Sequence, residues 1–203
     1  MGAVLNQPGP LQCERPRQAG AAAAATYAMS DNVFDINYTV AGEVTYSETN
    51  HRATFGNSAS VVSVARLITG YGYGNRAIEF ESMVLAGGSQ LVGLRPSLTQ
   101  NTTATQLGQG TNDIGYRSTD DLDINGVTVT SLVTYTAGDK IGFIYRASLG
   151  TVEIFKNGTS LYTATGISGD MTPAAQGLNS NTSSIRVSTA WSYTLPGDVL
   201  YWR

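Results

Sequence analysis

From Phe34 onward, apolar and polar side chains alternate along short stretches of the chain, and Phe34–Val40 is the clearest case. Alternation with a period of two is typical of a β-strand that has one buried face and one solvent-facing side. The same pattern, or a short run rich in β-branched residues, predicts further strands at Glu43–Tyr46, Ala53–Phe55, Ser60–Ile68, Ala77–Leu85, Gln90–Leu94, Ile114–Tyr116, Val127–Val133, Lys140–Arg146, Thr151–Lys156, Leu161–Ala164, Pro173–Gln176 and Ser184–Trp191.

Turn residues separate these strands. Gly87-Gly88-Ser89 has the spacing of a hairpin loop, and Asn157-Gly158 favours a type I′ turn because both residues tolerate a positive φ. Residues 97–112 are rich in Thr, Asn, Gln and Gly, which predicts a long loop. No window beyond the N-terminal region shows a helical period, so the pattern predicts an antiparallel sandwich or barrel.

The two ends of the chain differ from this β region. Residues 1–30 are rich in Pro, Gly, Gln and Ala, so they predict an extended arm, which is either a disordered tail or a segment that becomes ordered on a partner. Residues 193–203 form an apolar tail, which we expect to be buried against the sandwich or a neighbouring subunit. The candidate assembly residues are Val4, Leu5 and Leu11 in the arm and Leu200, Tyr201 and Trp202 in the tail.

Composition and charge limit the function classes. Hydrophobic residues make up 41% of the 203 residues, which is enough for a core, whereas charged residues make up only 13%. The formal net charge is −3 and no basic cluster is visible, so the sequence disfavours nucleic acid or an anionic membrane surface as a partner. No apolar run approaches the ~20 residues that span a bilayer, and the N-terminus lacks a secretory signal pattern. We therefore expect synthesis in the cytoplasm.

Few residues offer metal or nucleophile chemistry. Cys13 is the single cysteine, so we expect neither an intrachain disulfide nor a cysteine-based metal site. His51 is the single histidine and lies in a polar, turn-like stretch, which favours a solvated loop residue over a catalytic one. No cofactor is expected.

Two acidic groups were weighed as functional sites. Glu79 and Glu81 share one face of a strand and could serve as the paired carboxylates of a glycosidase, but their alternation with apolar residues favours an outward face without catalysis. Asp120, Asp121 and Asp123 could form a calcium loop of oxygen ligands. A solvated turn is favoured there because the EF-hand spacing is absent.

The second half of the chain resembles SPRY domains. Tyr135-Thr-Ala-Gly-Asp-Lys-Ile-Gly-Phe143 is similar to a strand of that family, and Gly150-Thr-Val-Glu-Ile-Phe-Lys-Asn-Gly-Thr-Ser-Leu161 is similar to the hairpin that follows it. Further similar segments are Gly74–Glu81, Gln90–Leu94, Pro173-Ala174 and Gly115-Tyr116-Arg117-Ser118, the last in a form common in bacterial and phage members. The chain departs from the family at Arg76 and Ala77, where aromatic residues are usual, and it lacks the tyrosine usual before Pro173-Ala174.

The resemblance implies an all-β fold, an antiparallel two-sheet sandwich of the concanavalin A-like, SPRY-like jelly-roll type, over residues 31–192. It also implies a non-catalytic binding module, since partners in the family are proteins, peptides and sometimes glycans held by loops at one rim. The candidate ligand-binding residues are Tyr71 and Tyr73, which offer flat amphipathic surface in a glycine-rich loop, and Arg117. The alternative for that loop is a connection whose tyrosines pack locally.

The leading hypothesis is a bacteriophage virion protein, made in the host cytoplasm, that decorates the capsid or forms part of the tail or fibre. It rests on the phage-like SPRY pattern, the low charge with abundant Thr, Asn and Gly, and the adhesive segments at both ends. The expected partners are other virion proteins, further copies of the chain, and a host-surface glycan or protein. A carbohydrate- or receptor-binding adhesion module is the alternative, followed by a polysaccharide-degrading enzyme, which needs an acid pair that the sequence does not place.

Overall fold

The structure is a computed structural model that describes residues 34–39, 44–49, 51–56, 63–67, 74–96, 106–178 and 182–202. Every regular element within these ranges is a β-strand. No helix of the described ranges is long and apolar enough to cross a membrane. The strands are β1 (Phe34–Thr39), β2 (Val44–Ser47), β3 (Arg52–Phe55), β4 (Ser63–Leu67), β5 (Asn75–Val84), β6 (Ser89–Pro96), β7 (Ile114–Arg117), β8 (Asp121–Ile124), β9 (Val127–Ser131), β10 (Lys140–Arg146), β11 (Thr151–Lys156), β12 (Thr159–Thr165), β13 (Met171–Leu178), β14 (Ser184–Val187) and β15 (Leu200–Tyr201).

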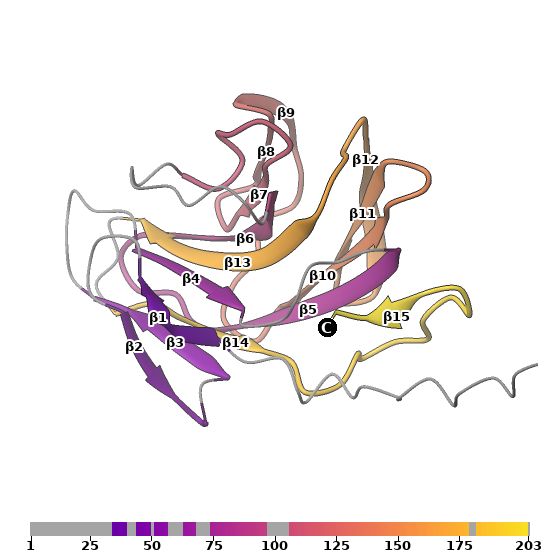
Figure 1. The fold of residues 1–203 in the computed structure, drawn as a ribbon. Helices are drawn as coiled ribbons and strands as arrows, with labels where there is room; N and C mark the ends of the chain where they lie inside the picture. The colour runs from indigo at the N-terminus through magenta and orange to yellow at the C-terminus, as the bar shows by residue number, and fades with distance from the viewer. Residues whose placement is uncertain are drawn as a thin grey trace, which may run out of the picture.

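The strands form two sheets that pack face to face (Figure 1). Sheet A has seven strands in the order β1-β4-β13-β6-β7-β8-β9, and sheet B has eight, in the order β12-β11-β10-β5-β14-β3-β2 with β15 beside β5. The β15–β5 pair is parallel, whereas the pairs along the two sheet paths are antiparallel. The predicted antiparallel two-sheet sandwich is confirmed.

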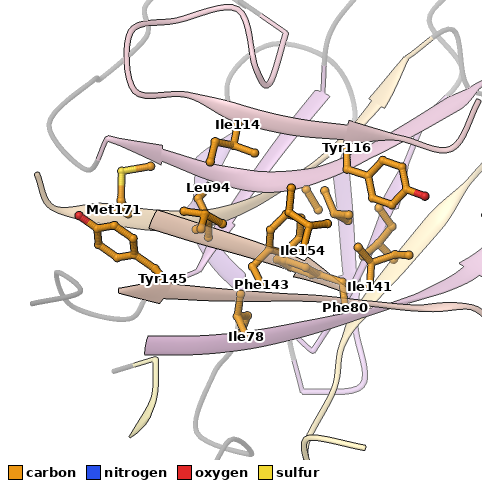
Figure 2. Close-up of a cluster of buried hydrophobic side chains, with 14 of the residues drawn as sticks. Ile78, Phe80, Leu94, Ile114, Tyr116, Ile141, Phe143, Tyr145, Ile154 and Met171 are labelled. Carbon is orange, nitrogen blue, oxygen red and sulfur yellow. The ribbon is translucent and has the colours of Figure 1, made fainter. Parts of the chain in front are cut away.

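The core lies between the sheets because alternate side chains of each strand point inward. Ile78 and Phe80 of β5 and Phe143 of β10 face Leu94 and Ile114 of sheet A (Figure 2). The rings of Phe80 and Phe143 meet edge to face, with centroids 6.4 Å apart. Burying each such side chain stabilises the fold by about 1.5–3 kcal/mol, so the alternation of apolar residues fixes which face of each strand turns inward.

Two hairpins turn through Asn-Gly. Asn157 and Gly158 have φ angles of 48° and 79°, and Asn125 and Gly126 have φ angles of 55° and 81°. Positive φ at both central residues is the geometry of a type I′ turn, so the prediction for Asn157-Gly158 is confirmed. The strand pattern missed β8, which is the first strand of the second hairpin.

The C-terminal part of the chain covers sheet B from outside. The predicted strand Ser184–Trp191 ends at Val187, and residues 188–199 then leave the sheet before β15 returns to β5. We call residues 188–199 the crossing segment. A Cβ added to Gly142 would lie 2.6 Å from the Trp191 indole, so this segment lies directly on the outer face of β10.

The expected burial of the tail residues is confirmed in part. Trp202 is 1% exposed and stacks on Tyr145, with ring centroids 6.2 Å apart, so it belongs to the core of its own chain. Tyr201 is half-buried against the same core. Leu200 is 52% exposed, so it is not buried against the sandwich, and its burial against a neighbouring subunit stays a prediction.

Two other predictions concern loops and the arm. Residues 106–112 contain no strand, which agrees with the predicted loop, but Leu107 is buried and its backbone N–H donates to Gln176 Oε1 at 2.7 Å. This part of the loop therefore packs on the outer face of sheet A.

The arm of residues 1–30, with Cys13 and the candidates Val4, Leu5 and Leu11, lies outside the described residues.

Candidate functional site

A pocket of about 390 Å³ lies on the outer face of sheet B. Its volume falls within the roughly 300–1,000 Å³ of typical small-molecule sites. We call it the outer-face pocket. Its lining comes from the β2–β3 turn, from β5, β10 and β14, and from the start of the crossing segment, and it consists of Glu48, His51, Glu81, Lys140, Arg186, Ser188, Thr189, Ala190, Trp191 and Ser192.

Strand register brings the charged side chains of this pocket together. Glu81 of β5 stands opposite Arg186 of β14 on one side and opposite Lys140 of β10 on the other. Residues directly opposite each other in an antiparallel pair have Cβ atoms about 4.5–5.5 Å apart. Phe80 and Ile141, their neighbours along the strands, point into the core, so the charged row points outward.

Ion pairs hold the acidic and basic groups in place. Arg186 Nη2 lies 2.5 Å from Glu81 Oε2, and Arg186 Nη1 lies 3.5 Å from Glu48 Oε2. Arg52 Nη1 lies 3.5 Å from the other oxygen of Glu48. The hydrogen bond to Glu81 raises the pKa of Arg186, and the nearby carboxylates outweigh the opposing effect of burial. The Arg186 guanidinium is therefore a fixed positive group of the pocket.

Glu79 lies on the predicted outward face of its strand but is not exposed to solvent there. Its side chain does point to the outer face, but the residue is only 1% exposed because the crossing segment covers it. Glu79 Oε1 accepts a hydrogen bond from Ser192 Oγ at 2.8 Å, and Lys140 Nζ donates to the same hydroxyl at 2.5 Å. Ser192 N also donates to Glu79 Oε2 at 3.4 Å. Glu79 thus holds Ser192 of the pocket wall, and Glu81 forms an ion pair with Arg186. The two carboxylates therefore have separate partners.

Three further groups complete the lining. His51 lies in the turn between β2 and β3, and its Nδ1 donates to the Glu48 carbonyl oxygen at 2.8 Å. Trp191 is half-buried and meets Phe155 edge to face, with centroids 6.0 Å apart. Ser188 is 5% exposed, and its hydroxyl has no hydrogen-bond partner among the described residues. Buried hydroxyls in folded proteins are normally satisfied, so Ser188 marks a place where the pocket lacks a polar group.

The structure places Arg117 away from this pocket. Arg117 Nη2 lies 3.2 Å from Asp123 Oδ2, and Nη1 lies 3.8 Å from Asp121 Oδ2. Asp123 is 1% exposed and also accepts hydrogen bonds from Thr128 Oγ1 at 2.5 Å and Gln106 Nε2 at 3.2 Å. Arg117 thus ties β7 to β8, and a ligand-binding role for it stays a prediction.

Other predicted sites are not assembled in the described residues. The solvated turn predicted for the acidic cluster is wrong at Asp121 and Asp123, which lie in strand β8. No three His, Cys, Asp or Glu side chains in the described part of the chain gather so that they could hold a metal ion. Tyr71 and Tyr73 lie outside the described residues.

Of the pocket residues, only His51 and Glu81 are among the candidates that the sequence offers. The sequence could have indicated Arg186 as a candidate, because it is a charged residue between the core residues Ile185 and Val187 in a chain that is only 13% charged. A charge on the outward side of a strand marks that face as polar. The strand register determines which charged side chains lie opposite each other, and the sequence alone does not predict that register.

No family model matches this sequence, and no curated protein matches it either. Among solved structures, the SPRY domain of human HERC1 superposes with a TM-score of 0.65 and 18% identity, covering 79% of this chain and 99% of that one. The fold is that of a SPRY domain. The TRIM65 PSpry domain is another SPRY neighbour, with a TM-score of 0.61, 14% identity and coverage of 77% of this chain and 91% of that one. At these identities the likeness establishes the fold and leaves the ligand open.

Stonustoxin contains the same fold as part of a larger protein. Its TM-score is 0.58 at 18% identity, and the match covers 77% of this chain but 27% of the toxin chain. The SPRY fold therefore occurs both as a crystallised domain and inside a longer polypeptide.

Proposed function

We propose that this chain is a non-catalytic binding module of the SPRY fold and that it holds its ligand in the outer-face pocket. The observation that carries the proposal is the gathering of four oppositely charged side chains around one hollow, in a chain that is only 13% charged. These are Glu48, Glu81, Lys140 and Arg186. Ion pairs and strand pairing already hold these groups, so little side-chain freedom is lost when a ligand binds.

The proposed role needs no reacting group. Glu79 and Glu81, the two carboxylates weighed as an acid pair, are engaged by Ser192 and Arg186 respectively. Glu79 fixes Ser192 in the pocket wall, and Glu81 fixes Arg186 in the pocket lining. A recognition site requires polar groups that are fixed in this way. The resemblance to SPRY domains in the second half of the sequence also supports a binding role.

We further propose that the module is a structural component of a bacteriophage virion, on the capsid or in the tail or fibre. The phage-like segment Gly115–Ser118 and the low charge support this role. The edge of sheet A supports it as well, because Val127 and Val129 of β9 are 61% and 43% exposed and the strand carries no charged residue. An uncharged edge strand is a template for pairing with another chain, such as a second virion protein.

The binding proposal is tested with the full chain and host-surface extracts that have been resolved into glycans and proteins. Arg186→Gln should reduce retention of the specific component at least tenfold, because it removes the donor shared by Glu48 and Glu81. Arg146→Gln is the matched control, since Arg146 pairs with Glu153 at 3.2 Å on the same sheet but does not line the pocket. Equal loss in both variants, or loss in neither, would contradict the pocket as the site.

The virion proposal is tested by mass spectrometry of purified particles from cells that express the chain. Recovery of the chain in stoichiometric amount supports the proposal. Its absence from particles, together with ligand binding by the free protein, supports instead the alternative of an adhesion module that is unrelated to virions.

A further inference from the structure

We propose that the outer-face pocket binds an uncharged polyhydroxyl group, that is, one sugar residue of a glycan. This inference rests on the proposed function, because it names the ligand class of the same pocket. Its support comes from the charge balance of the lining, from the mixture of donors and acceptors, from the aromatic wall, and from the position of the pocket within sheet B.

The charges around the pocket cancel. Glu48 and Glu81 carry two negative charges, and Lys140 and Arg186 carry two positive charges. The groups directly behind them also balance, since Arg52 lies against Glu48 and Glu79 lies 3.9 Å from Lys140. An anionic or a cationic ligand would have to compete with an existing ion pair and would leave one charge unpaired, which is unfavourable in a partly buried site.

A hydroxyl group suits this lining because it donates one hydrogen bond and accepts others. Glu48 and Glu81 provide acceptors, and Arg186 and Lys140 provide donors. Hydrogen bonds to charged groups are stronger than those between neutral groups, so neighbouring hydroxyls of a sugar would be held without any net charge of their own. The Ser188 hydroxyl, which has no partner among the described residues, could pair with one more.

Trp191 supplies the apolar part of the site. Its indole is fixed between Gly142 and Phe155, and the next residue, Ser192, is tied to Glu79. A rigid aromatic side chain gives a flat apolar surface at low entropic cost. A sugar ring has hydroxyls around its edge and C–H groups on its faces, so it matches a pocket with one aromatic wall and otherwise polar lining.

The sheet position disfavours a peptide at this site. Extended peptides commonly bind by adding a strand to a free sheet edge. The strands under the pocket are interior ones, since β10 pairs with β5 and β11, and β14 pairs with β5 and β3. Their backbone groups are therefore already paired, and recognition has to use side chains, as it does for a sugar.

The test is a glycan array with the full chain, followed by calorimetric titration of the best oligosaccharide. Glu81→Gln should weaken binding at least tenfold, whereas Glu153→Gln, which alters the Arg146 ion pair on the same sheet face, should leave the affinity within twofold. Ser188→Ala should weaken binding several-fold while leaving the fold intact, because its hydroxyl supports no other described residue. Thermal unfolding of each variant shows that the fold is retained.

Salt dependence separates the ligand classes. Binding of a neutral sugar should change less than twofold between about 50 mM and 500 mM salt, because there is no ligand charge to screen. A steep fall in affinity would overturn the neutral ligand. Binding of peptides but no glycan, with loss in Arg186→Gln, would overturn the sugar proposal and leave the binding pocket standing. Absence of binding to either class would contradict both proposals.

Discussion

The β8–β9 and β11–β12 hairpins have the same turn, but the outward side chains of their strands differ. Both turn through Asn-Gly with positive φ at each residue. In β11 the inward side chains Val152 and Ile154 are fully buried, as in an ordinary amphipathic strand. In β8 the inward side chains Leu122 and Ile124 are buried in the same way, but the outward Asp123 is also only 1% exposed. The turn is thus set by two local residues, whereas burial of the strand depends on partners elsewhere in the chain.

The outer strands of the two hairpins differ in the same way. β9 is the edge of sheet A, and its Val127 and Val129 face solvent. β12 is the edge of sheet B, and its Leu161 and Tyr162 pack against the core. Both hairpins therefore send apolar side chains into the core, but the β8–β9 hairpin also contains a buried carboxylate and has an edge strand with exposed valines. Four comparisons of stability test this difference.

The largest expected difference lies between apolar residues of the two hairpins. Ile154→Ala should lower the free energy of unfolding by about 3–4 kcal/mol, because it leaves a cavity in the core. Val129→Ala should change it by less than about 0.5 kcal/mol, since that side chain is 43% exposed. Urea denaturation measures both values. A similar loss in the two variants would mean that β9 is packed against something in solution.

The next comparison concerns the carboxylates. Asp123→Ala should cost about 2–3 kcal/mol, because it removes the acceptor shared by Arg117, Thr128 and Gln106. Glu153→Ala should cost less than about 1 kcal/mol, because its ion pair with Arg146 is partly exposed. The measurement is again urea denaturation. Equal costs would refute the view that Asp123 holds the β8–β9 hairpin.

The sequence predicted most of the fold because most strands resemble β11, with apolar residues at every second position. β8 was missed although Leu122 and Ile124 alternate with Asp121 and Asp123, because three aspartates beside Asn125-Gly126 favoured a solvated turn and carboxylates are normally exposed. The contacts of Asp123 with Arg117 and Thr128 offset the cost of burying its carboxylate. No local sequence pattern predicts these contacts.

The candidate site was less predictable than the fold. Glu79 has the same alternation as Glu81, yet one is covered by the crossing segment and the other lines the pocket. The difference arises from Trp191 and Ser192, more than a hundred residues later in the sequence, as the separation of 113 positions between Glu79 and Ser192 shows. A pattern with a period of two records which side a residue faces, but it carries no information about what lies on that side.

The turn glycines give a smaller comparison. Gly158→Ala should cost about 1–2 kcal/mol, because an L-residue is strained at a φ of 79°. A Cβ there would also lie 2.4 Å from the Tyr193 ring, so Tyr193→Ala should recover part of the cost in the double variant. Gly126→Ala has a φ of 81° but no such ring, so Tyr193→Ala should not relieve it. Double-mutant cycles measured by thermal unfolding check both expectations.

The smallest expected effect is a pH dependence at Asp139, which precedes β10 and contacts the turn of the β11–β12 hairpin. Burial alone would raise the pKa of Asp139, but hydrogen bonds from Thr136, Asn157 and Lys156 lower it below its ordinary 3.8. Because the folded pKa is the lower one, the ionised carboxylate stabilises the fold above the unfolded pKa and loses this effect as the pH falls through the folded pKa. Wild type should therefore lose more stability than Asp139→Asn between about pH 5 and pH 3. Parallel curves for the two proteins would exclude this contribution.

The two tryptophans lie in different environments, so their fluorescence can follow two different properties of the molecule. Trp202 is sealed in the interior beside Tyr145, whereas Trp191 stands at the wall of the outer-face pocket. Fluorescence from the first follows the integrity of the whole sandwich, and fluorescence from the second senses the immediate surroundings of the pocket. Replacing Trp202 by phenylalanine leaves Trp191 as the single tryptophan, so selective tryptophan excitation turns occupancy of the site into an optical signal that requires no attached dye.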